Sequence, residues 1–328
     1  MKRRLCLAVG AGAAWSCVSA RLPAQPARAA RRRIGVLAPS TVANEAVTLK
    51  PFFDQMRELG WVEGRNVVYD HAYADDLRGN LDPLAGRLVA RNPDIIFAPP
   101  SPAAVAARRA TRRIPIVFAT GTDPVGTGLV ESLARPGGNV TGVLSVIDSL
   151  APKLVEIIRA VLPAVRRLGY LSDPADPRSR TDLAALGSPL SAWNMSVAVA
   201  DVVEPSALNR AIDTLIERRV DAILTGTSLT FNLRRQVVER SHAAGIPVFG
   251  HRAEFAEAGA LVAYGASLPQ QMRRAAELVD KILNGARPAD IPVEQPSVFE
   301  MVVNLKTARA LGIALAPTLL LRADRVIE

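Results

Sequence analysis

Polar residues that could bind a ligand recur at one kind of place in this chain, close after short apolar runs. The candidate ligand-binding residues are Ser40, Thr41, Ser101, Thr122, Asp123, Asp173, Thr227, Ser228, His251 and Glu254. Hydroxyls and the free amides at helix starts suit a carboxylate, whereas the three acidic side chains could hold a cation. A structural alternative exists for Ser40, Ser101 and Ser228, because serine is a favoured helix N-cap.

Sequence signatures of catalysis or of a bound cofactor are largely missing. Residues 121–127 have the glycine spacing of a phosphate-binding loop, but Thr127 stands where lysine is required and Pro124 removes an amide donor. No G-x-G-x-x-G, G-x-S-x-G or H-E-x-x-H motif occurs, and the three histidines lack metal-ligand spacing. We therefore predict a protein without catalytic residues, metal or cofactor. A two-domain α/β enzyme with its active site in a cleft is the alternative.

The elements that would position these residues alternate along the chain. The predicted strands of a first unit are 34–38, 66–69, 94–98 and 114–118, and its predicted helices are 42–59, 77–91 and 101–111. Short apolar runs separated by helices are typical of parallel strands covered on both faces. Residues 120–142 are rich in Gly, Pro, Thr and Asn, which indicates a loop and linker.

A second unit repeats this plan. Its predicted strands are 167–171, 196–200, 221–225, 246–249, 261–264 and 296–304, and its predicted helices are 153–161, 180–193, 205–218, 232–244 and 269–284. A length of 328 residues, at about 150 per domain, agrees with two domains. The predicted fold is therefore α/β, with two doubly wound parallel-sheet lobes. Because ligands bind beyond the carboxyl ends of such strands, the strand-end loops of both lobes would face one cleft.

The amino terminus has the pattern of a secretory signal peptide spanning residues 1–29. Met1–Arg4 is basic, residues 5–18 are apolar or small, and the segment ends in a small-x-small site with cleavage expected after Ala29. Fourteen residues are too few to span a bilayer core of about 30 Å, which disfavours a membrane anchor. The protein is thus expected in the periplasm, exported by the Sec or the twin-arginine route. Both cysteines lie in this segment, so the mature chain would have no disulfide.

The net charge of +9 first suggests a nucleic-acid partner. The first 29 residues hold five basic residues and no acidic one, so cleavage leaves 35 basic against 31 acidic residues. Three more arginines, at 31–33, stand at the new terminus before the first predicted strand. The remaining body is nearly neutral, and we therefore predict no nucleic-acid partner.

Four strings of this sequence resemble the solute-binding proteins of ATP-binding-cassette importers that have the type I periplasmic binding protein fold. These strings occupy residues 59–67, 122–142, 279–288 and 304–312, and the resemblance extends from about 32 to 328. It implies two lobes joined by three crossings, near 139–143, 264–268 and 291–295, that close on a ligand by hinge motion. The implied lobes are residues 31–141 with 268–291, and residues 142–264 with 295–328.

The resemblance also implies a role. Better-known relatives bind aromatic or other hydrophobic amino acids, and hydroxyls and amides hold the carboxylate while an acidic side chain holds the ammonium. Carried onto this chain, Ser101 and Ser40 fit the carboxylate, and Asp173 or Asp123 the ammonium. The implied protein is a periplasmic monomer that delivers a small solute, such as an amino acid or related carboxylate, to a membrane permease.

Two other roles are compatible with two such lobes, that of a ligand sensor and that of a transcription regulator. A periplasmic sensor that passes ligand occupancy to a membrane receptor has the same features in sequence. A transcription regulator with the same lobes is disfavoured, because an export signal rather than a helix-turn-helix precedes the first strand.

Overall fold

The computed structural model describes residues 31–145 and 150–328. The predicted signal peptide and both cysteines lie outside the described residues. None of the helices in the described part of the chain is both long and apolar enough to cross a membrane.

The first lobe is built on a five-stranded parallel sheet of order β2-β1-β3-β4-β5. Its strands are β1 (Arg32–Ala38), β2 (Val67–Tyr73), β3 (Ile95–Phe97), β4 (Ile116–Gly121) and β5 (Val140–Leu144). Its helices are α1 (Val42–Thr48), α2 (Lys50–Glu58), α3 (Leu81–Ala90) and α4 (Ser101–Ala110), with the short 3₁₀ turn η1 (Arg78–Asn80). The predicted helix 42–59 is thus two helices, because Pro51 cannot continue α1 but is well placed in the first turn of α2.

Strand β5 lies in the region for which the sequence predicted a loop, and this prediction was wrong there. All five residues of β5 are buried, and the strand pairs in parallel with β4. Thr141 and Gly142 interrupt its apolar run, which hides the strand in the sequence. Gly142 is required by packing, since a Cβ there would lie 2.3 Å from the carbonyl oxygen of Phe118.

The second lobe has a seven-stranded sheet of order β12-β11-β10-β9-β8-β6-β7. Its strands are β6 (Arg167–Ser172), β7 (Ser196–Asp201), β8 (Ala222–Thr225), β9 (Val248–Gly250), β10 (Val262–Ala266), β11 (Phe299–Asn304) and β12 (Arg325–Ile327). Only the β10–β11 pair is antiparallel among these described strands. Its larger helices are α5 (Ala151–Val161), α6 (Pro177–Ala192), α7 (Leu208–Glu217) and α9 (Arg234–Ala243).

Several short elements of the second lobe escaped the sequence analysis. They are α8 (Ser228–Asn232), α10 (Ala253–Glu257), α12 (Leu305–Ala310), α13 (Pro317–Leu320) and β12. Each of these helices spans at most six residues, which is too short to show a helical period. The predicted helix 205–218 consists of the turn η2 (Pro205–Ala207) followed by α7. The helix predicted at 232–244 begins as α9 at Arg234, and α8 precedes it directly.

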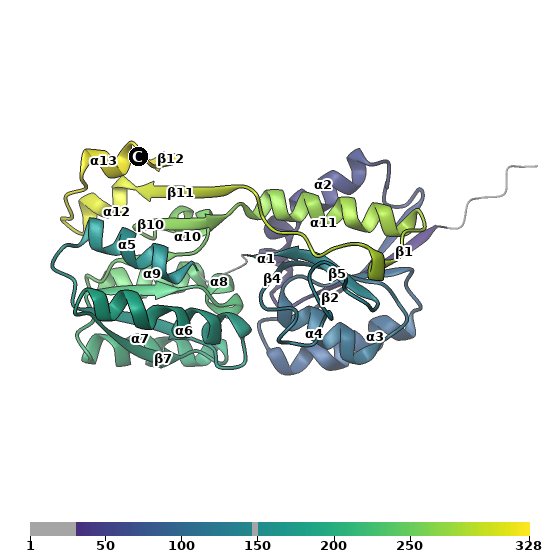
Figure 1. The fold of residues 1–328 in the computed structure, drawn as a ribbon, viewed down its shortest axis with the longest axis horizontal. Coiled ribbons are helices and arrows are strands. Elements are labelled where there is room, and N and C mark those ends of the chain that lie inside the picture. Colours follow the sequence, from purple (N-terminus) through teal and green to yellow (C-terminus); the bar gives the residue numbers. More distant parts are fainter. Residues whose placement is uncertain (1–30, 146–149) are drawn as a thin grey trace, which may run out of the picture. The chain divides into compact units, whose positions relative to one another are not determined.

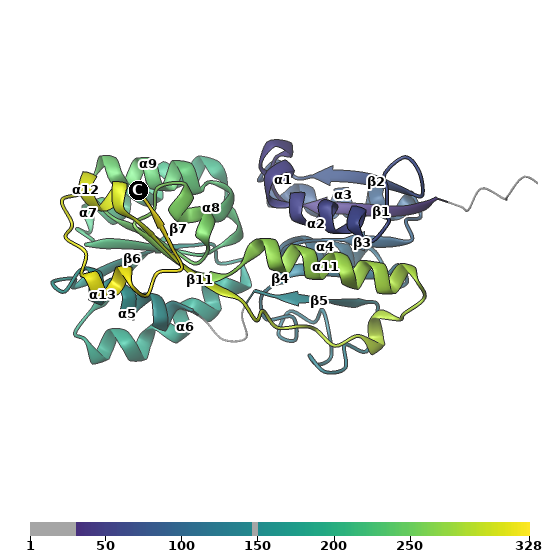
Figure 2. The same cartoon turned by 90° about the horizontal axis from the view of Figure 1, so that it is seen from above.

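Helix α11 (Leu268–Leu283) comes after the second-lobe strand β10 but packs on the first lobe, against α2, β4 and β5. Figures 1 and 2 show it lying along the first-lobe sheet, after which the turn η3 (Pro288–Asp290) leads back towards β11. The chain thus passes between the sheets after β5, after β10 and before β11. The predicted fold class, two α/β lobes with mostly parallel sheets, is confirmed.

Candidate functional site

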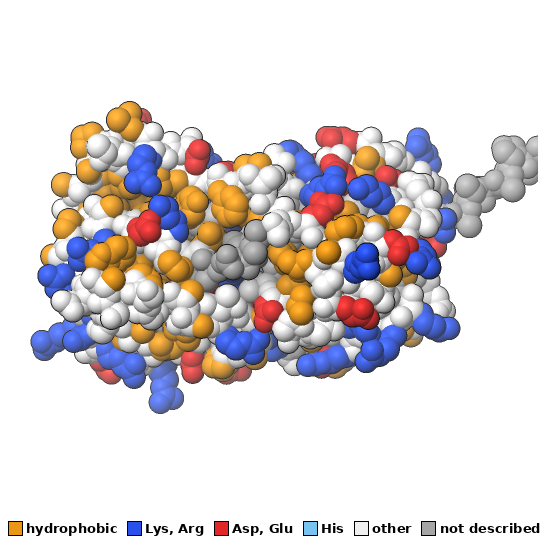
Figure 3. Space-filling view, viewed as in Figure 1, with side chains coloured by type: hydrophobic (Ala, Val, Ile, Leu, Met, Phe, Trp, Pro, Cys, Tyr) orange, Lys and Arg blue, Asp and Glu red, His pale blue; other side chains and the backbone are white. Residues whose placement is uncertain are grey.

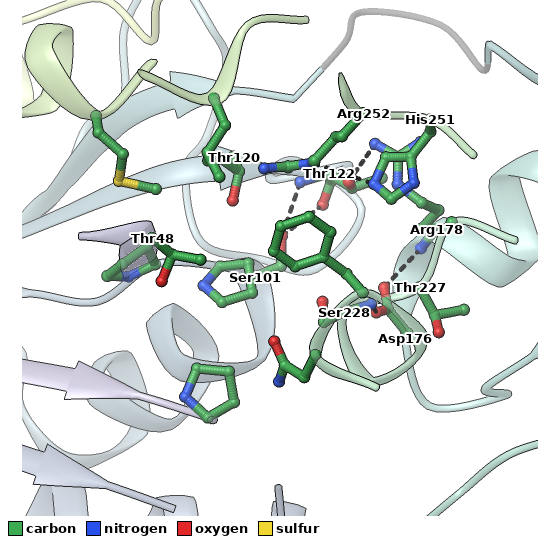
Figure 4. Close-up of a pocket in the computed structure, with 18 of the residues that line it drawn as sticks. Thr48, Ser101, Thr120, Thr122, Asp176, Arg178, Thr227, Ser228, His251 and Arg252 are labelled. Carbon is green, nitrogen blue, oxygen red and sulfur yellow. Dashed lines mark hydrogen bonds between the residues drawn. The ribbon is translucent and has the colours of Figure 1, made fainter. Parts of the chain in front are cut away.

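A pocket lies where the two lobes meet, beyond the carboxyl ends of their parallel strands, with about 600 Å³ of space between its atoms including its open mouth. Figure 4 shows the polar side chains that converge on it from both lobes. The loops after β1, β3 and β4 form one wall, and the loops after β6, β8 and β9 form the other. Leu268 and Met272 of α11 complete the lining. This is the location that the topology of doubly wound sheets predicts.

Five of the ten residues that the sequence singled out line this pocket. They are Ser101, Thr122, Thr227, Ser228 and His251. Their placement follows from the βα turns, because each stands at the end of a strand or the start of the next helix. Thr227 also caps α8, since its hydroxyl accepts a hydrogen bond from the amide of Thr230 at 3.2 Å. For Thr227 the structural role and the pocket position therefore coexist.

The other five residues lie outside the pocket lining, and four of them have structural partners. Ser40 contacts Asn44 and Glu45, and Thr41 caps α1. Asp123 accepts a hydrogen bond from the amide of Gly126 at 2.9 Å, and Asp173 forms an ion pair with Arg78 of the first lobe.

Glu254 is the fifth of these outlying residues. It lines a neighbouring cavity, where one carboxylate oxygen is buried without a hydrogen-bond partner. Burial raises the pKa of this carboxyl group, while the nearby Arg252 opposes that shift.

The loop after β4 brings Thr120 and Thr122 to the pocket in a strained conformation. Thr120 has a φ of 58°, which a β-branched residue rarely adopts, and the β4–β5 register shifts at this point. Ser101 holds the loop, because its hydroxyl accepts a hydrogen bond from the Thr122 amide at 2.7 Å. Strain of this kind tends to occur at functional sites. The hydroxyl of Thr120 makes no hydrogen bond within the described structure, so it is available to a ligand.

Asp176 and Arg178, which the sequence analysis missed, stand at the start of α6. Asp176 is 2% exposed, and its carboxylate accepts hydrogen bonds from the amides of Arg178 at 3.0 Å and Ser228 at 2.8 Å. These contacts fix the carboxylate between two helix starts. Arg178 reaches across to the first lobe, where its guanidinium donates to the hydroxyls of Ser145 at 2.6 Å and Thr122 at 3.4 Å.

Arg252 is the most unusual group in the pocket. Its side chain is buried, yet its only hydrogen bond goes to Nε2 of His251 at 3.2 Å, and no carboxylate lies within ion-pair distance in the described structure. Its guanidinium lies 5.2 Å from the centre of the Phe231 ring, in a cation–π contact. Burial lowers the pKa of Arg252 to about 10, so the group stays charged at neutral pH. In Figure 4 it extends towards Thr120 and Thr122.

His251 is neutral in this setting. Burial, followed by the charges of Arg178 and Arg252, lowers its pKa well below the ordinary value. A neutral imidazole can accept the hydrogen bond from Arg252, which orients that guanidinium. The backbone of His251 is itself tightly packed, since a Cβ on Gly265 would lie 1.7 Å from its carbonyl oxygen.

Glu45 supplies the remaining charged group of the lining, from α1. It is 6% exposed and accepts hydrogen bonds from the Thr48 hydroxyl at 2.8 Å and the Ser40 amide at 3.3 Å. Burial raises the pKa of Glu45 to about 7, although these two hydrogen bonds oppose the shift. Leu49 and the prolines 39, 99 and 100 surround it with apolar surface.

The arrangement suits a small zwitterion with an apolar body. A buried cation without a partner attracts a carboxylate, a fixed aspartate attracts an ammonium group, and prolines, Leu49 and Met272 offer an apolar surface. Residues 31–145 and 150–328 contain no group of three or more His, Asp or Glu side chains placed to hold a metal ion.

Comparison with known proteins agrees with this geometry. Residues 34–327 match the family model of the ABC transporter substrate binding protein. The chain is 27% identical to the tyrosine-binding protein of Clostridioides difficile over 263 residues, which are 80% of this chain and 75% of that protein. The chain therefore belongs to the ABC transporter substrate binding family, which confirms the resemblance drawn from the sequence.

Two solved structures share the arrangement of both lobes. A conserved domain protein of Vibrio cholerae superposes with a TM-score of 0.84 at 27% identity, covering 90% of this chain and 99% of that one. An ABC domain from Streptococcus pneumonia in complex with L-Trp superposes with a TM-score of 0.83 at 27% identity, covering 91% of this chain and all of that one.

Proposed function

We propose that this member of the substrate-binding family is a non-catalytic periplasmic protein that captures an amino acid with a large apolar side chain and delivers it to an importer. The observation that carries the ligand class is Arg252, a buried cation in the pocket that forms no ion pair within the described structure, the main acidic influence being the charge of Glu254. The bound solutes of the relatives, tyrosine and L-Trp, support the same class.

The charged groups of the second lobe define how the ligand would lie. The carboxylate would bind between the Arg252 guanidinium and the hydroxyls of Thr120 and Ser228, neither of which has another hydrogen-bond partner in the described structure. The ammonium would face Asp176, whose carboxylate is already oriented by two amides. We therefore assign to Asp176 the role that the resemblance suggested for Asp173 or Asp123.

The first lobe would enclose the side chain of the ligand. Leu49, Pro100 and Met272 provide apolar contacts, and Phe231 provides an aromatic edge from the other wall. Glu45 and Thr48 stand among these apolar residues as the polar pair that could accept a phenol or indole hydrogen. This combination favours tyrosine and tryptophan over aliphatic amino acids.

Direct contacts between the lobes would form as the pocket closes on its ligand. They include the Arg78–Asp173 ion pair, the hydrogen bond from Asn232 to Asp76 at 2.7 Å, the hydrogen bonds of Arg178 to the first lobe and the Arg180–Asp123 pair. Each joins a residue of one lobe to a residue of the other, so all of them require the lobes to be together. Small-angle X-ray scattering with and without L-tryptophan would test closure by a decrease in the radius of gyration.

Ligand-induced thermal stabilisation across the twenty amino acids and common organic acids tests the proposed ligand class. We expect tyrosine, tryptophan or phenylalanine to raise the melting temperature most, and tryptamine, which lacks the carboxylate, to have no effect. A folded protein that none of these solutes stabilises would contradict the proposed function. Turnover of a bound solute would instead support an enzyme.

The periplasmic location can be tested separately. N-terminal sequencing of the protein recovered from a periplasmic extract should give Ala30 as the first residue. Recovery of the uncleaved chain from the cytoplasm would contradict this part of the proposal without affecting the ligand class.

A further inference from the structure

A second cavity lies at the end of the first lobe remote from the ligand pocket, where the strands of its sheet begin. It has about 1330 Å³ of space between its atoms, including its wide open mouth, and is bordered by the start of β1, the segments that precede β4 and β5, and the end of α11. Because parallel strands place their amino ends at the opposite edge from their carboxyl ends, this cavity and the ligand pocket are separated by the length of the sheet.

Basic side chains dominate the lining of this cavity. It contains five arginines and one acidic residue, Asp94, which forms an ion pair with Arg32 at 2.9 Å. Arg287 pairs with Asp290 at 2.7 Å. The other three arginines, Arg108, Arg112 and Arg113, have no side-chain hydrogen bond or ion pair within the described structure. Figure 3 shows Lys and Arg side chains at this end of the first lobe.

Arg108 is the strongest indication that the cavity is a binding site. Its Nε and Nη1 atoms are buried and have no hydrogen-bond partner. A guanidinium group with buried, unpaired N–H donors is energetically costly, and removing one hydrogen-bond partner of such a charged group costs more than for a neutral group. Arg112 adds a like charge nearby. An anion with several acceptor oxygens would satisfy these donors and offset the repulsion.

We propose that this cavity is a second binding site, which takes a phosphate group through Arg108, Arg112 and Arg113. Three unpaired guanidinium groups match a doubly charged anion with several oxygens better than a single carboxylate, because each fork can bind two oxygens. The phosphate can belong to a free anion or to the headgroup of an anionic lipid. Because the site is remote from the ligand pocket, phosphate and the amino acid bind without competition.

Isothermal titration of the full mature chain with inorganic phosphate tests the site, with sodium chloride holding the ionic strength constant. Cosedimentation with phosphatidylcholine vesicles that contain or lack phosphatidylglycerol tests the lipid source. Binding of phosphate alone assigns the site to a free anion, and association with the anionic vesicles assigns it to a headgroup. A folded protein that neither binds phosphate nor associates with the anionic vesicles would contradict the proposal.

Matched double variants distinguish this site from general charge attraction. R112Q/R113Q removes two exposed arginines of the cavity, whereas R309Q/R322Q removes two exposed arginines of the second lobe that have no ion pair. We expect R112Q/R113Q to weaken phosphate or vesicle binding about tenfold or more. R309Q/R322Q should change this binding less than about twofold. Equal losses in the two variants would overturn the proposal. Melting temperatures of both variants verify that they fold.

Discussion

The two walls of the ligand pocket differ in chemistry. The second lobe contributes Asp176, Arg178 and Arg252, all buried and held by contacts within that lobe or, for Arg178, across to the first. The first lobe contributes hydroxyls, prolines and a single carboxyl group, Glu45. From this difference we infer a division between the two walls: the second lobe binds the charged groups of the ligand, and the first lobe covers its side chain.

Such a division has a consequence for the order of events. Charge attraction acts at a longer range than apolar contact, so a ligand can first bind to the second lobe alone. In the proposed closure, the first lobe would then add uncharged contacts to the ligand side chain. Substitutions of the charged second-lobe residues should therefore weaken ligand binding most. Substitutions in the first lobe should instead alter which ligand is preferred and how stability depends on pH.

Replacing Arg252 should have the largest effect. R252Q removes the proposed carboxylate partner, and the loss of one partner of a buried ion pair costs about 3–5 kcal/mol, which weakens binding of the amino acid by roughly a hundredfold or more. The stability of the free protein should change less than the affinity, because the variant no longer buries this cation but also loses its charge interaction with the buried Glu254. Calorimetric titration and thermal unfolding of the same samples measure both effects. R309Q, on the second-lobe surface, is the control.

Replacing Glu45 should change the pH dependence of stability. The pKa of Glu45 is about 7 in the folded protein against 4.5 for an ordinary glutamate, so the folded state retains a proton that the unfolded state releases in this window. Stability contributed by this group therefore falls as the pH rises from 4.5 to 7, by roughly 3 kcal/mol in all.

The variant E45Q should not show this decrease in stability with rising pH, and it should be more stable than the wild type above pH 7. Urea unfolding at several pH values measures the difference. The exposed E217Q serves as control and should retain the wild-type profile. An E45Q profile parallel to that of the wild type would show that the first-lobe carboxyl is ionised at lower pH than its burial implies.

Replacing Asp176 should weaken ligand binding and also lower stability, because its two carboxylate oxygens each accept a backbone hydrogen bond. D176N removes the charge that would face the ammonium, which costs about 1.5–3 kcal/mol, or roughly tenfold to a hundredfold in affinity. Asparagine is as good an N-cap as aspartate, so α6 should keep its start. The asparagine NH2 group cannot accept the hydrogen bond from the Ser228 amide, however, which should cost about 1–3 kcal/mol of stability. An affinity unchanged by D176N, measured by calorimetric titration, would exclude Asp176 as the ammonium partner.

The smallest effect is expected from a charge pair at the pocket rim. Arg180 of the second lobe lies 3.6 Å from Asp123 of the first, and the two side chains are 68% and 37% exposed. Exposed pairs contribute about 1 kcal/mol at most, so R180Q should alter affinity less than about fivefold. A larger effect would show that charges outside the pocket also govern closure.

The sequence predicted the two α/β lobes well because the long apolar runs and amphipathic helices carry a clear period. It missed β5, where Thr141 and Gly142 conceal a buried strand, and it missed the short helices α8 and α10, which contribute Phe231 and flank Arg252. The domain boundaries and the hinge stay predictions.

The pocket was predictable in part. Ser101, Thr122, Thr227, Ser228 and His251 follow from the strand-end rule, which is a property of topology. Asp176, Arg178 and Arg252 were not predictable, because charged residues beside a turn are ordinarily solvent-exposed and only the fold shows that these are buried. The neighbouring Asp173 has the same type and a similar position in sequence, yet it pairs with Arg78 outside the pocket lining.

The most direct test of the division between the two walls is a thermodynamic cycle between the ligand carboxylate and Arg252. Wild type and R252Q would each be titrated with L-tryptophan and with its methyl ester, which retains the ammonium and the indole. The wild type should bind the free acid roughly a hundredfold more tightly than the ester, and R252Q should lose this preference. A variant that still prefers the acid by the wild-type factor would contradict the assignment of the carboxylate to Arg252.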